Sequence, residues 1–219
     1  MPSVEYSTCD LMGLLDWKAG IDELREKIPM MGVDLESIDD VKVSVEIFPN
    51  RPDMLSIEGF ARSLKGFLGV NMGLVNYAVA DSDVKLVVED SVKDIRPAVT
   101  AALAEEVVLD NNTVKSVMDM QEKLHLTHGR NRAKVAIGVH DLDKVSPPFT
   151  YKAVKPKDIS FVPLDMGKKM DLSQILRKHP KGLEFANLLE GKDKYPVFLD
   201  SIGEVLSFPP IINGELTKL

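Results

Sequence analysis

The chain has 219 residues, of which 44% are hydrophobic and 28% are charged, so it has the composition of a globular protein with a sizeable core. Its net charge of −7 argues against a protein whose whole surface grips nucleic acid, although a local basic patch is compatible with it. A single cysteine excludes an intrachain disulfide, and no apolar run reaches the roughly 20 residues that span a membrane, so we expect a cytoplasmic protein without a secretory signal.

The first predicted elements are two short helices within residues 10–28. Apolar residues, Trp17 among them, recur at helical spacing through this range. An interruption at Gly20 and Asp22 divides the pattern, and one of these two residues is expected to cap the second helix.

A strand is predicted next, in the alternating stretch VKVSVEIF at 41–48. Its buried face is expected to carry Val41, Val43, Val45 and Ile47.

The stretch FPNRPDM at 48–54 separates this strand from a helix. Pro49 and Pro52 cannot donate ladder hydrogen bonds, so the strand must stop there. Asp53 is the predicted N-cap of a helix that runs to Gly69. A rigid strand-turn-helix corner is the favoured interpretation, ahead of a site where Arg51 binds a carboxylate or phosphate.

The segment 70–83 predicts a linker or a departing strand, and its composition shifts at the polar ADSD. We therefore predict two domains, 1–82 and 83–219. Helical and strand patterns intermix without regular alternation, which indicates the α+β class.

The second predicted domain opens on a short strand, VKLVVED, followed by an ambiguous stretch at 96–110. Thr113 is expected to cap a helix that ends before Gly129. AKVAIGVHDL at 133–142 predicts a strand buried on both faces. Two short strands around Pro156 follow.

The C-terminal part predicts a helix, DLSQILRKHPKG, with Asp171 as its cap and Gln174 completing a capping box. YPVFLD and EVLSF, joined by SIG, predict a hairpin.

Familiar catalytic motifs are absent from the sequence. It contains no glycine-rich phosphate loop, no HExxH or paired CxxC zinc motif, and no GxSxG elbow. His125 and His128 are three residues apart, and a surface pair at a helix end is favoured over a shared ligand.

Two segments are candidates for function. The basic stretch 123–134 offers Lys123, Arg130, Arg132 and Lys134 as RNA contacts, with a solvated turn as the slightly favoured alternative. VLSFPPIING at 205–214 combines a rigid apolar backbone with Ser207 and Asn213, which suits a small-molecule pocket wall and a buried crossover equally well.

Several stretches, among them EIFPNRPDMLSIEGFARSL, GRNRAKVAIGVHDLDK and VLSFPPIIN, closely resemble the N-terminal part of the phenylalanyl-tRNA synthetase β subunit of the archaeal and eukaryotic type. The resemblance covers nearly the whole chain. It implies a small first domain followed by a B3/B4 domain that hydrolyses tRNA(Phe) mischarged with tyrosine. It also implies an α-subunit partner in an α2β2 enzyme, where the activation site uses ATP and Mg2+; no cofactor is expected in this chain.

The family continues beyond the matched region, so we expect an N-terminal fragment with an incomplete editing pocket. The resemblance favours the pocket wall over the crossover, and its candidate residues are Leu206, Ser207, Phe208, Pro209, Asn213 and His140. The alternatives are a non-catalytic module for subunit assembly or tRNA docking, and a free-standing deacylase.

Overall fold

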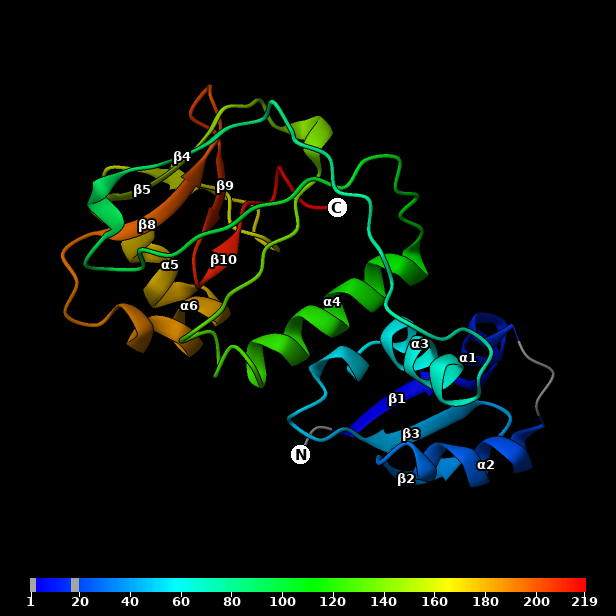
Figure 1. The fold of residues 1–219 in the computed structure, drawn as a ribbon. Helices are drawn as coiled ribbons and strands as arrows, with labels where there is room; N and C mark the ends of the chain where they lie inside the picture. Colours follow the sequence, from blue (N-terminus) through cyan, green and yellow to red (C-terminus); the bar gives the residue numbers. More distant parts are fainter. Residues whose placement is uncertain (1–2, 17–19) are drawn as a thin grey trace. The chain divides into compact units, whose positions relative to one another are not determined.

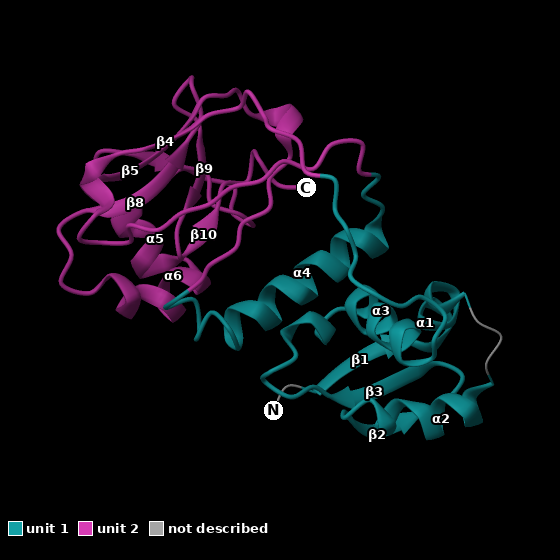
Figure 2. Ribbon diagram, viewed as in Figure 1, with its two compact units in different colours: residues 1–78, 108–134 teal, residues 79–107, 135–219 magenta. Residues whose placement is uncertain are grey.

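A computed structural model describes residues 3–16 and 20–219, so Trp17 of the predicted helices lies outside the described residues. Contacts group the chain into two compact units (Figure 2): unit 1 is Met1–Ala78 with Val108–Lys134, and unit 2 is Val79–Val107 with Val135–Leu219. The units are not continuous in sequence, because Leu124 of helix α4 (Asn111–Leu126) packs against the core of unit 1. The division at residue 82 stays a prediction.

Unit 1 is built around a three-stranded antiparallel sheet in the order β1-β3-β2 (Figure 1). Its elements are β1 (Ser3–Ser7), α1 (Thr8–Leu15), α2 (Ile21–Met30), β2 (Asp34–Ile38), β3 (Lys42–Glu46), the 3-10 helix η1 (Pro52–Met54), α3 (Ile57–Phe67) and α4. The two predicted N-terminal helices are confirmed, and Gly20 is the N-cap of the second.

The predicted strand at 41–48 is present as β3, with Val43, Val45 and Ile47 fully buried. Val41 was predicted to share their face, but it is 76% exposed. The reason is a local turn: the carboxylate of Asp39 accepts hydrogen bonds from the backbone N–H groups of Val41 and Lys42, both at 2.8 Å. Val41 therefore belongs to that turn and lies before the strand.

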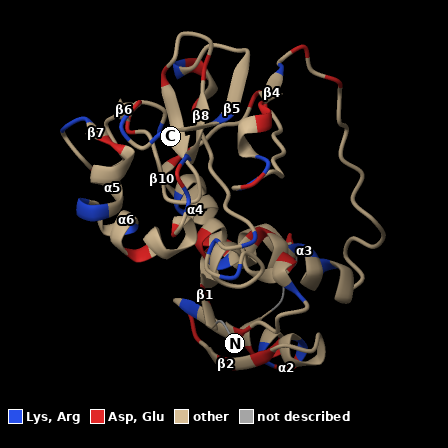
Figure 3. Ribbon diagram, turned by 90° about the vertical axis from the view of Figure 1, so that its left-hand side faces the viewer, with Lys and Arg blue, Asp and Glu red and all other residues tan. Residues whose placement is uncertain are grey.

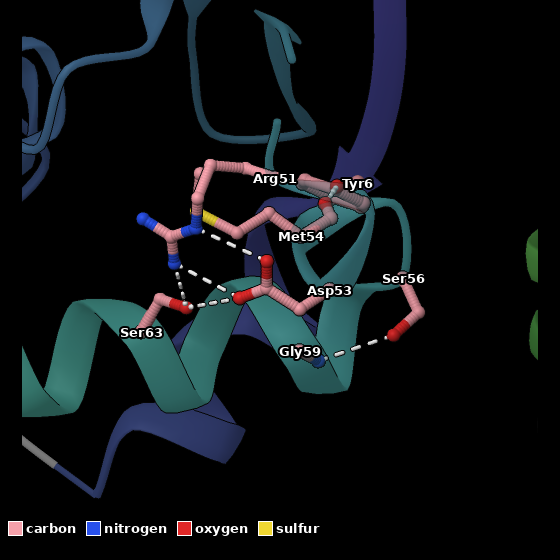
Figure 4. A network of polar contacts seen from close by, with 7 residues as sticks. All are labelled: Tyr6, Arg51, Asp53, Met54, Ser56, Gly59 and Ser63. Atoms are coloured by element: carbon pink, nitrogen blue, oxygen red, sulfur yellow. Dashed lines mark hydrogen bonds and ion pairs between the residues drawn. The ribbon is translucent and has the colours of Figure 1, made fainter. Parts of the chain in front are cut away.

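The FPNRPDM corner turns the chain as predicted, but Asp53 is not the helix cap. The N-cap of α3 is Ser56, whose hydroxyl accepts from Gly59 N at 3.1 Å (Figure 4). The carboxylate of Asp53 instead accepts from Arg51 Nε at 3.0 Å and from Arg51 Nη2 at 2.9 Å. The Ser63 hydroxyl also accepts a hydrogen bond from Arg51 Nη2, at 3.0 Å. Asp53 and Ser63 therefore hold the Arg51 guanidinium within the corner.

The contacts of the corner predict which of two substitutions, Ser56→Ala or Asp53→Ala, destabilises the protein more. We expect Ser56→Ala to destabilise the protein by about 1 kcal/mol, the usual loss for an N-cap. Asp53→Ala should cost less than about 1 kcal/mol, because the Arg51 and Asp53 side chains are 39% and 38% exposed and water screens their attraction. Urea unfolding of both variants measures the two losses, and a larger loss for Asp53→Ala would contradict the assignment of the cap.

The same ion pair has a defined pH dependence. The hydrogen bond from Arg51 holds the pKa of the Asp53 carboxyl below its ordinary value. The stability it contributes is therefore present above pH about 4 and is lost as the pH falls through the lowered pKa. Asp53→Asn should accordingly be less stable than the unchanged protein at neutral pH, and the difference should vanish in acid.

Unit 2 contains a five-stranded sheet in the order β10-β9-β8-β5-β4, in which only the β4–β5 pair is parallel, and a two-stranded β6–β7 sheet (Figure 1). The strands are β4 (Leu86–Val88), β5 (Phe149–Val154), β6 (Ser160–Phe161), β7 (Met170–Asp171), β8 (Tyr195–Leu199), β9 (Val205–Phe208) and β10 (Ile212–Asn213). The helices are η2 (Asp90–Val92), η3 (Leu142–Lys144), α5 (Leu172–Lys178), α6 (Pro180–Phe185) and η4 (Ala186–Leu189).

Two apolar clusters pack against this five-stranded sheet. The larger one joins α5 and α6 to strand residues that include Val197, Val205 and Phe208. The second joins Val92 to Tyr151 and Ala153, with Phe198 packed against it. Val197 and Phe198 are consecutive in β8 and therefore project from opposite faces of the sheet, so the two clusters pack against opposite faces.

Most of the local predictions for this part of the chain are confirmed. The hairpin is β8–β9, and Asp171 and Gln174 form the capping box of α5. The helix predicted over DLSQILRKHPKG ends at Lys178, and Pro180 begins a second helix, α6. Together with the three-stranded sheet and helices of unit 1, the structure confirms the α+β class.

Two further predictions were wrong. Thr113 does not cap α4; the cap is Asp110, whose carboxylate accepts from the Thr113 N–H at 2.8 Å and from its hydroxyl at 2.7 Å. The predicted buried strand at 133–142 has no regular ladder in the structure, and Ile137 and Val139 are only partly buried. An apolar run indicates burial but not sheet pairing, and here the pairing positions beside β5 are taken by β4 and β8.

Candidate functional site

A row of side chains crosses one face of the five-stranded sheet of unit 2. The strand registers place five residues opposite one another from edge to edge: Val88, Tyr151, Phe198, Ser207 and Asn213. Directly paired residues project from the same face of a sheet, so the row changes from apolar and aromatic on β4, β5 and β8 to polar on β9 and β10. The Tyr151 and Phe198 rings are packed with centroids 5.0 Å apart.

The polar end of this row is joined by a segment far away in sequence. A Cβ atom placed on Gly138 would lie 3.0 Å from Nε2 of His140 and 3.1 Å from Oδ1 of Asn213. Both side chains therefore lie close against the Gly138 backbone, which is itself exposed. The structure thus brings Ser207, Asn213 and His140 together, three of the residues that the sequence nominated.

His140 is held from its other ring nitrogen. Nδ1 lies 2.8 Å from the hydroxyl of Thr217, a residue with no exposed surface. Burial lowers the pKa of His140 to about 4, so the ring is neutral at physiological pH. A neutral imidazole has one nitrogen that donates and one that accepts a hydrogen bond.

The other pocket candidates lie on β9 and in the turn that follows it. Phe208 belongs to the core beneath α5 and α6, where its ring stacks on Tyr195 with centroids 5.7 Å apart. Leu206 is buried and has no paired residue in β8, because the β8–β9 register shifts between Phe198 and Leu199. Pro209 is partly exposed in the turn between β9 and β10, which is closed by the Ile211 N–H donating to Phe208 O at 2.8 Å.

The four basic candidates of 123–134 differ in their surroundings. Arg130 and Lys134 are exposed, and Lys123 is partly buried. Arg132 is only 7% exposed, and its Nη2 donates to Glu122 Oε1 at 2.7 Å, so this cation is directed into the protein. Figure 3 shows the charged positions of the chain as blue and red segments of the ribbon.

The helix-end histidines do not form the surface pair that the sequence favoured. His128 is exposed, whereas His125 is 3% exposed and its Nδ1 lies 3.2 Å from Glu122 Oε1. Arg130, Asn131 and Arg132 form a left-handed turn, with φ angles of 50°, 53° and 65°, that folds the chain back onto the end of α4. Arg132 N donates to His125 O at 3.2 Å within this turn.

Three residues of the candidate site were missed by sequence reasoning: Phe198, Gly138 and Thr217. The alternation of YPVFLD carries a signal for Phe198, because it places that ring on a different face from Val197 and Leu199. Gly138 and Thr217 lie in segments without a local pattern that distinguishes them.

Other kinds of site are not evident in the parts of the chain that the structure describes. Residues 3–16 and 20–219 hold no group of three or more His, Cys, Asp or Glu side chains placed to bind a metal ion. Over the same ranges, no helix is both long enough and apolar enough to cross a membrane. A cavity of about 540 Å³ lies in unit 1, between Pro52, Tyr77 and Met120.

Similar proteins were found by sequence and by fold, although no family model matches the chain. The phenylalanine–tRNA ligase β subunit of Methanococcoides burtonii is 46% identical over 219 residues, and that of Methanocaldococcus jannaschii is 47% identical over 223 residues. Each alignment covers 100% of this chain and 40% of the relative. The crystal structure of an N-terminal fragment of the phenylalanyl-tRNA synthetase β subunit from Pyrococcus horikoshii superposes with a TM-score of 0.92 at 39% identity, covering 99% of this chain and 63% of the fragment.

The chain is a homologue of the N-terminal region of the phenylalanine–tRNA ligase β subunit. The resemblance seen in its motifs is thereby confirmed, and the β-subunit relatives are components of a ligase. The chain spans about 40% of the length of these β subunits, so the homology describes a part of that protein.

Proposed function

We propose that this region of the β subunit contributes residues to an editing site that hydrolyses tRNA(Phe) mischarged with tyrosine. The observation that supports the proposal is the row on the unit 2 sheet, where the partly exposed Phe198 ring adjoins Ser207 and Asn213, with His140 beside Asn213. An aromatic surface next to a few converging polar groups is the combination that recognises a phenol.

The need for such a site follows from the chemistry of the two amino acids. Tyrosine differs from phenylalanine by one hydroxyl group, and an apolar pocket rejects an added hydroxyl by a factor of only about 100. A second site that hydrogen-bonds the hydroxyl discriminates in the opposite sense, because phenylalanine leaves the polar partner of the site unpaired. Water then cleaves the ester between the tyrosyl carbonyl and the tRNA ribose, which yields free tyrosine and uncharged tRNA.

The rest of the proposal concerns the complete enzyme. We place the chain in a cytoplasmic α2β2 phenylalanine–tRNA ligase, whose α subunit activates phenylalanine with ATP and Mg2+. In this arrangement the unit 2 site and the activation site are on different subunits. Changes to the unit 2 site should therefore alter hydrolysis without altering the charging of tRNA(Phe) by phenylalanine.

Asn213→Ala tests this separation in the complete αβ ligase. The substitution removes an amide that lies close to Gly138, and we expect the hydrolysis of preformed Tyr-tRNA(Phe) to slow by about tenfold, the value of one good hydrogen bond. Charging with phenylalanine should keep its rate. Asn187→Ala, on the exposed surface of η4, is the matched control and should change neither reaction. Equal slowing of hydrolysis by both variants would contradict a specific role for Asn213.

A second proposed role is contact with tRNA at the end of α4. It is supported by the exposed Arg130 and Lys134 beside a left-handed turn whose hydrogen bonds include Lys134 N to Gly129 O at 2.8 Å. The hydrogen bonds of the turn order the backbone at Arg130, so little backbone conformational entropy is lost when its side chain pairs with a phosphate. Arg132 is not included, because it is buried against Glu122.

Arg130→Glu should weaken the binding of tRNA(Phe) to the complete ligase and reduce the salt dependence of that binding by about one phosphate contact. The control is Lys115→Glu, which makes the same change of charge at an exposed position within α4. A salt titration of binding separates the two. If the two variants give identical slopes of tRNA affinity against salt concentration, the effect depends on net charge alone and the turn does not contact tRNA.

A further inference from the structure

The hydroxyl of Thr217 sits among three possible partners at the edge of the sheet row. Its Oγ1 atom is 2.8 Å from Nδ1 of His140 and 3.4 Å from the carbonyl oxygens of both Leu206 and Gly214. Thr217 has no exposed surface, so water cannot substitute for any of these partners. The backbone fixes the arrangement further, since Asp141 N donates to Thr217 O at 3.0 Å.

A hydroxyl carries one proton, which limits how these groups can pair. If Thr217 donates its proton to Nδ1 of His140, neither carbonyl oxygen receives it. If Nδ1 of His140 carries a proton and donates it to Thr217, the hydroxyl proton is free to be shared by the two carbonyl oxygens. The second arrangement lets the buried hydroxyl both accept and donate, which is the state that buried hydroxyls favour.

The choice between these arrangements sets the chemistry of the opposite ring nitrogen. With the proton on Nδ1, Nε2 has a free lone pair and can only accept a hydrogen bond. Nε2 is the His140 atom that lies beside the exposed Gly138 backbone, which the Asn213 amide also approaches. An acceptor beside this exposed backbone suits a ligand that brings a hydroxyl group.

We propose that Thr217 is a positioning residue that holds His140 in the Nδ1-protonated tautomer, so that Nε2 accepts a hydrogen bond from the phenolic hydroxyl of a tyrosyl substrate. The hydrogen bond from the substrate rests on the proposed editing function, whereas the tautomer of His140 does not. Nε2 then distinguishes tyrosine from phenylalanine, because phenylalanine has no hydroxyl to give it.

The properties of the ring support recognition over proton transfer. Burial disfavours the charged imidazolium, and a nitrogen with a pKa of about 4 is a poor base for activating water at neutral pH. Such a nitrogen still accepts a hydrogen bond from a phenol. His140 is therefore assigned to binding the substrate, with Thr217 acting through it.

The tautomer can be measured directly by long-range 1H–15N NMR of the imidazole groups in this chain at neutral pH. We expect Nε2 of His140 to resonate as an unprotonated nitrogen and Nδ1 as a protonated one. Thr217→Val keeps the shape of the side chain but removes the acceptor, and should shift the ring toward the Nε2-protonated form that free histidine prefers. Thr217→Ser restores a hydroxyl and should restore the original spectrum. A protonated Nε2 in the unaltered chain would overturn the proposal, whatever the activity data show.

The recognition role is tested in the complete αβ ligase with preformed Tyr-tRNA(Phe). Thr217→Val should slow its hydrolysis by about tenfold, the value of one hydrogen bond, and Thr217→Ser should recover most of the rate. If Asn213→Ala slows hydrolysis while Thr217→Val leaves it unchanged, the proposed editing function stands and the role of Thr217 is wrong. If neither variant affects hydrolysis, the editing function itself is wrong.

Discussion

Replacing Gly59 by alanine should destabilise unit 1 by about 3 kcal/mol, the upper end of the usual cost of overpacking. A Cβ atom on Gly59 would lie 1.8 Å from the carbonyl oxygen of Asp53 and 3.0 Å from its carbonyl carbon. These are backbone atoms of the FPNRPDM corner, so they cannot move aside as a flexible side chain does. The corner would have to open, which would disturb the hydrogen bond from the Tyr6 hydroxyl to Met54 O and the Ser56 cap (Figure 4).

Gly66→Ala is the matched control on the same helix. The nearest atom to a Cβ at that position is Asn71 O at 3.7 Å, an ordinary contact distance. Because alanine favours the helix more than glycine does, Gly66→Ala should be neutral or stabilise the protein by up to about 1 kcal/mol. Urea unfolding followed by circular dichroism compares the two. Similar stabilities for both variants would show that α3 does not pack against the corner as closely as the structure indicates.

The corner also shows how far sequence patterns reach. The prolines predicted where the strand ends, and the helical spacing predicted α3. The cap was misplaced because Asp53 and Ser56, three residues apart, are both good cap residues. In the structure the Asp53 carboxylate is paired with Arg51, and Ser56 is the cap. The pairing depends on how the turn folds. A propensity scale does not contain this information.

Unit 2 shows the same division between local and distant information. The capping box of α5 and the β8–β9 hairpin each depend on a few neighbouring residues, and both were predictable. The closeness of Gly138 to Asn213, and of His140 to Thr217, joins residues 75 and 77 positions apart, and it arises from tertiary packing. Resemblance pointed to Ser207, Asn213 and His140, but it did not reveal that Gly138 and Thr217 lie beside them.

Ser207→Trp should have the largest effect on the proposed editing reaction. Ser207 is 7% exposed and lies between Phe198 and Asn213 in the row, so an indole at this position would occupy the space where a tyrosyl ring is expected to bind. Displacing a substrate from its reacting position by about 1 Å can cost a factor of about 100 in rate. We therefore expect hydrolysis of Tyr-tRNA(Phe) to slow by about a hundredfold or more.

Ser201→Trp is the matched control, because it adds the same indole at an exposed position of the hairpin turn between β8 and β9. Its hydrolysis rate and melting temperature should equal those of the unaltered enzyme. The melting temperature of Ser207→Trp shows whether the indole is tolerated by the fold.

The most direct test of the editing role is therefore the single-turnover hydrolysis of preformed Tyr-tRNA(Phe) by the complete αβ ligase carrying Ser207→Trp, with phenylalanine charging measured on the same preparation. We predict that hydrolysis is lost while charging continues at the rate of the unaltered enzyme. Normal hydrolysis by a folded Ser207→Trp enzyme would contradict the account, and the β9–β10 segment would then be a structural part of the sheet.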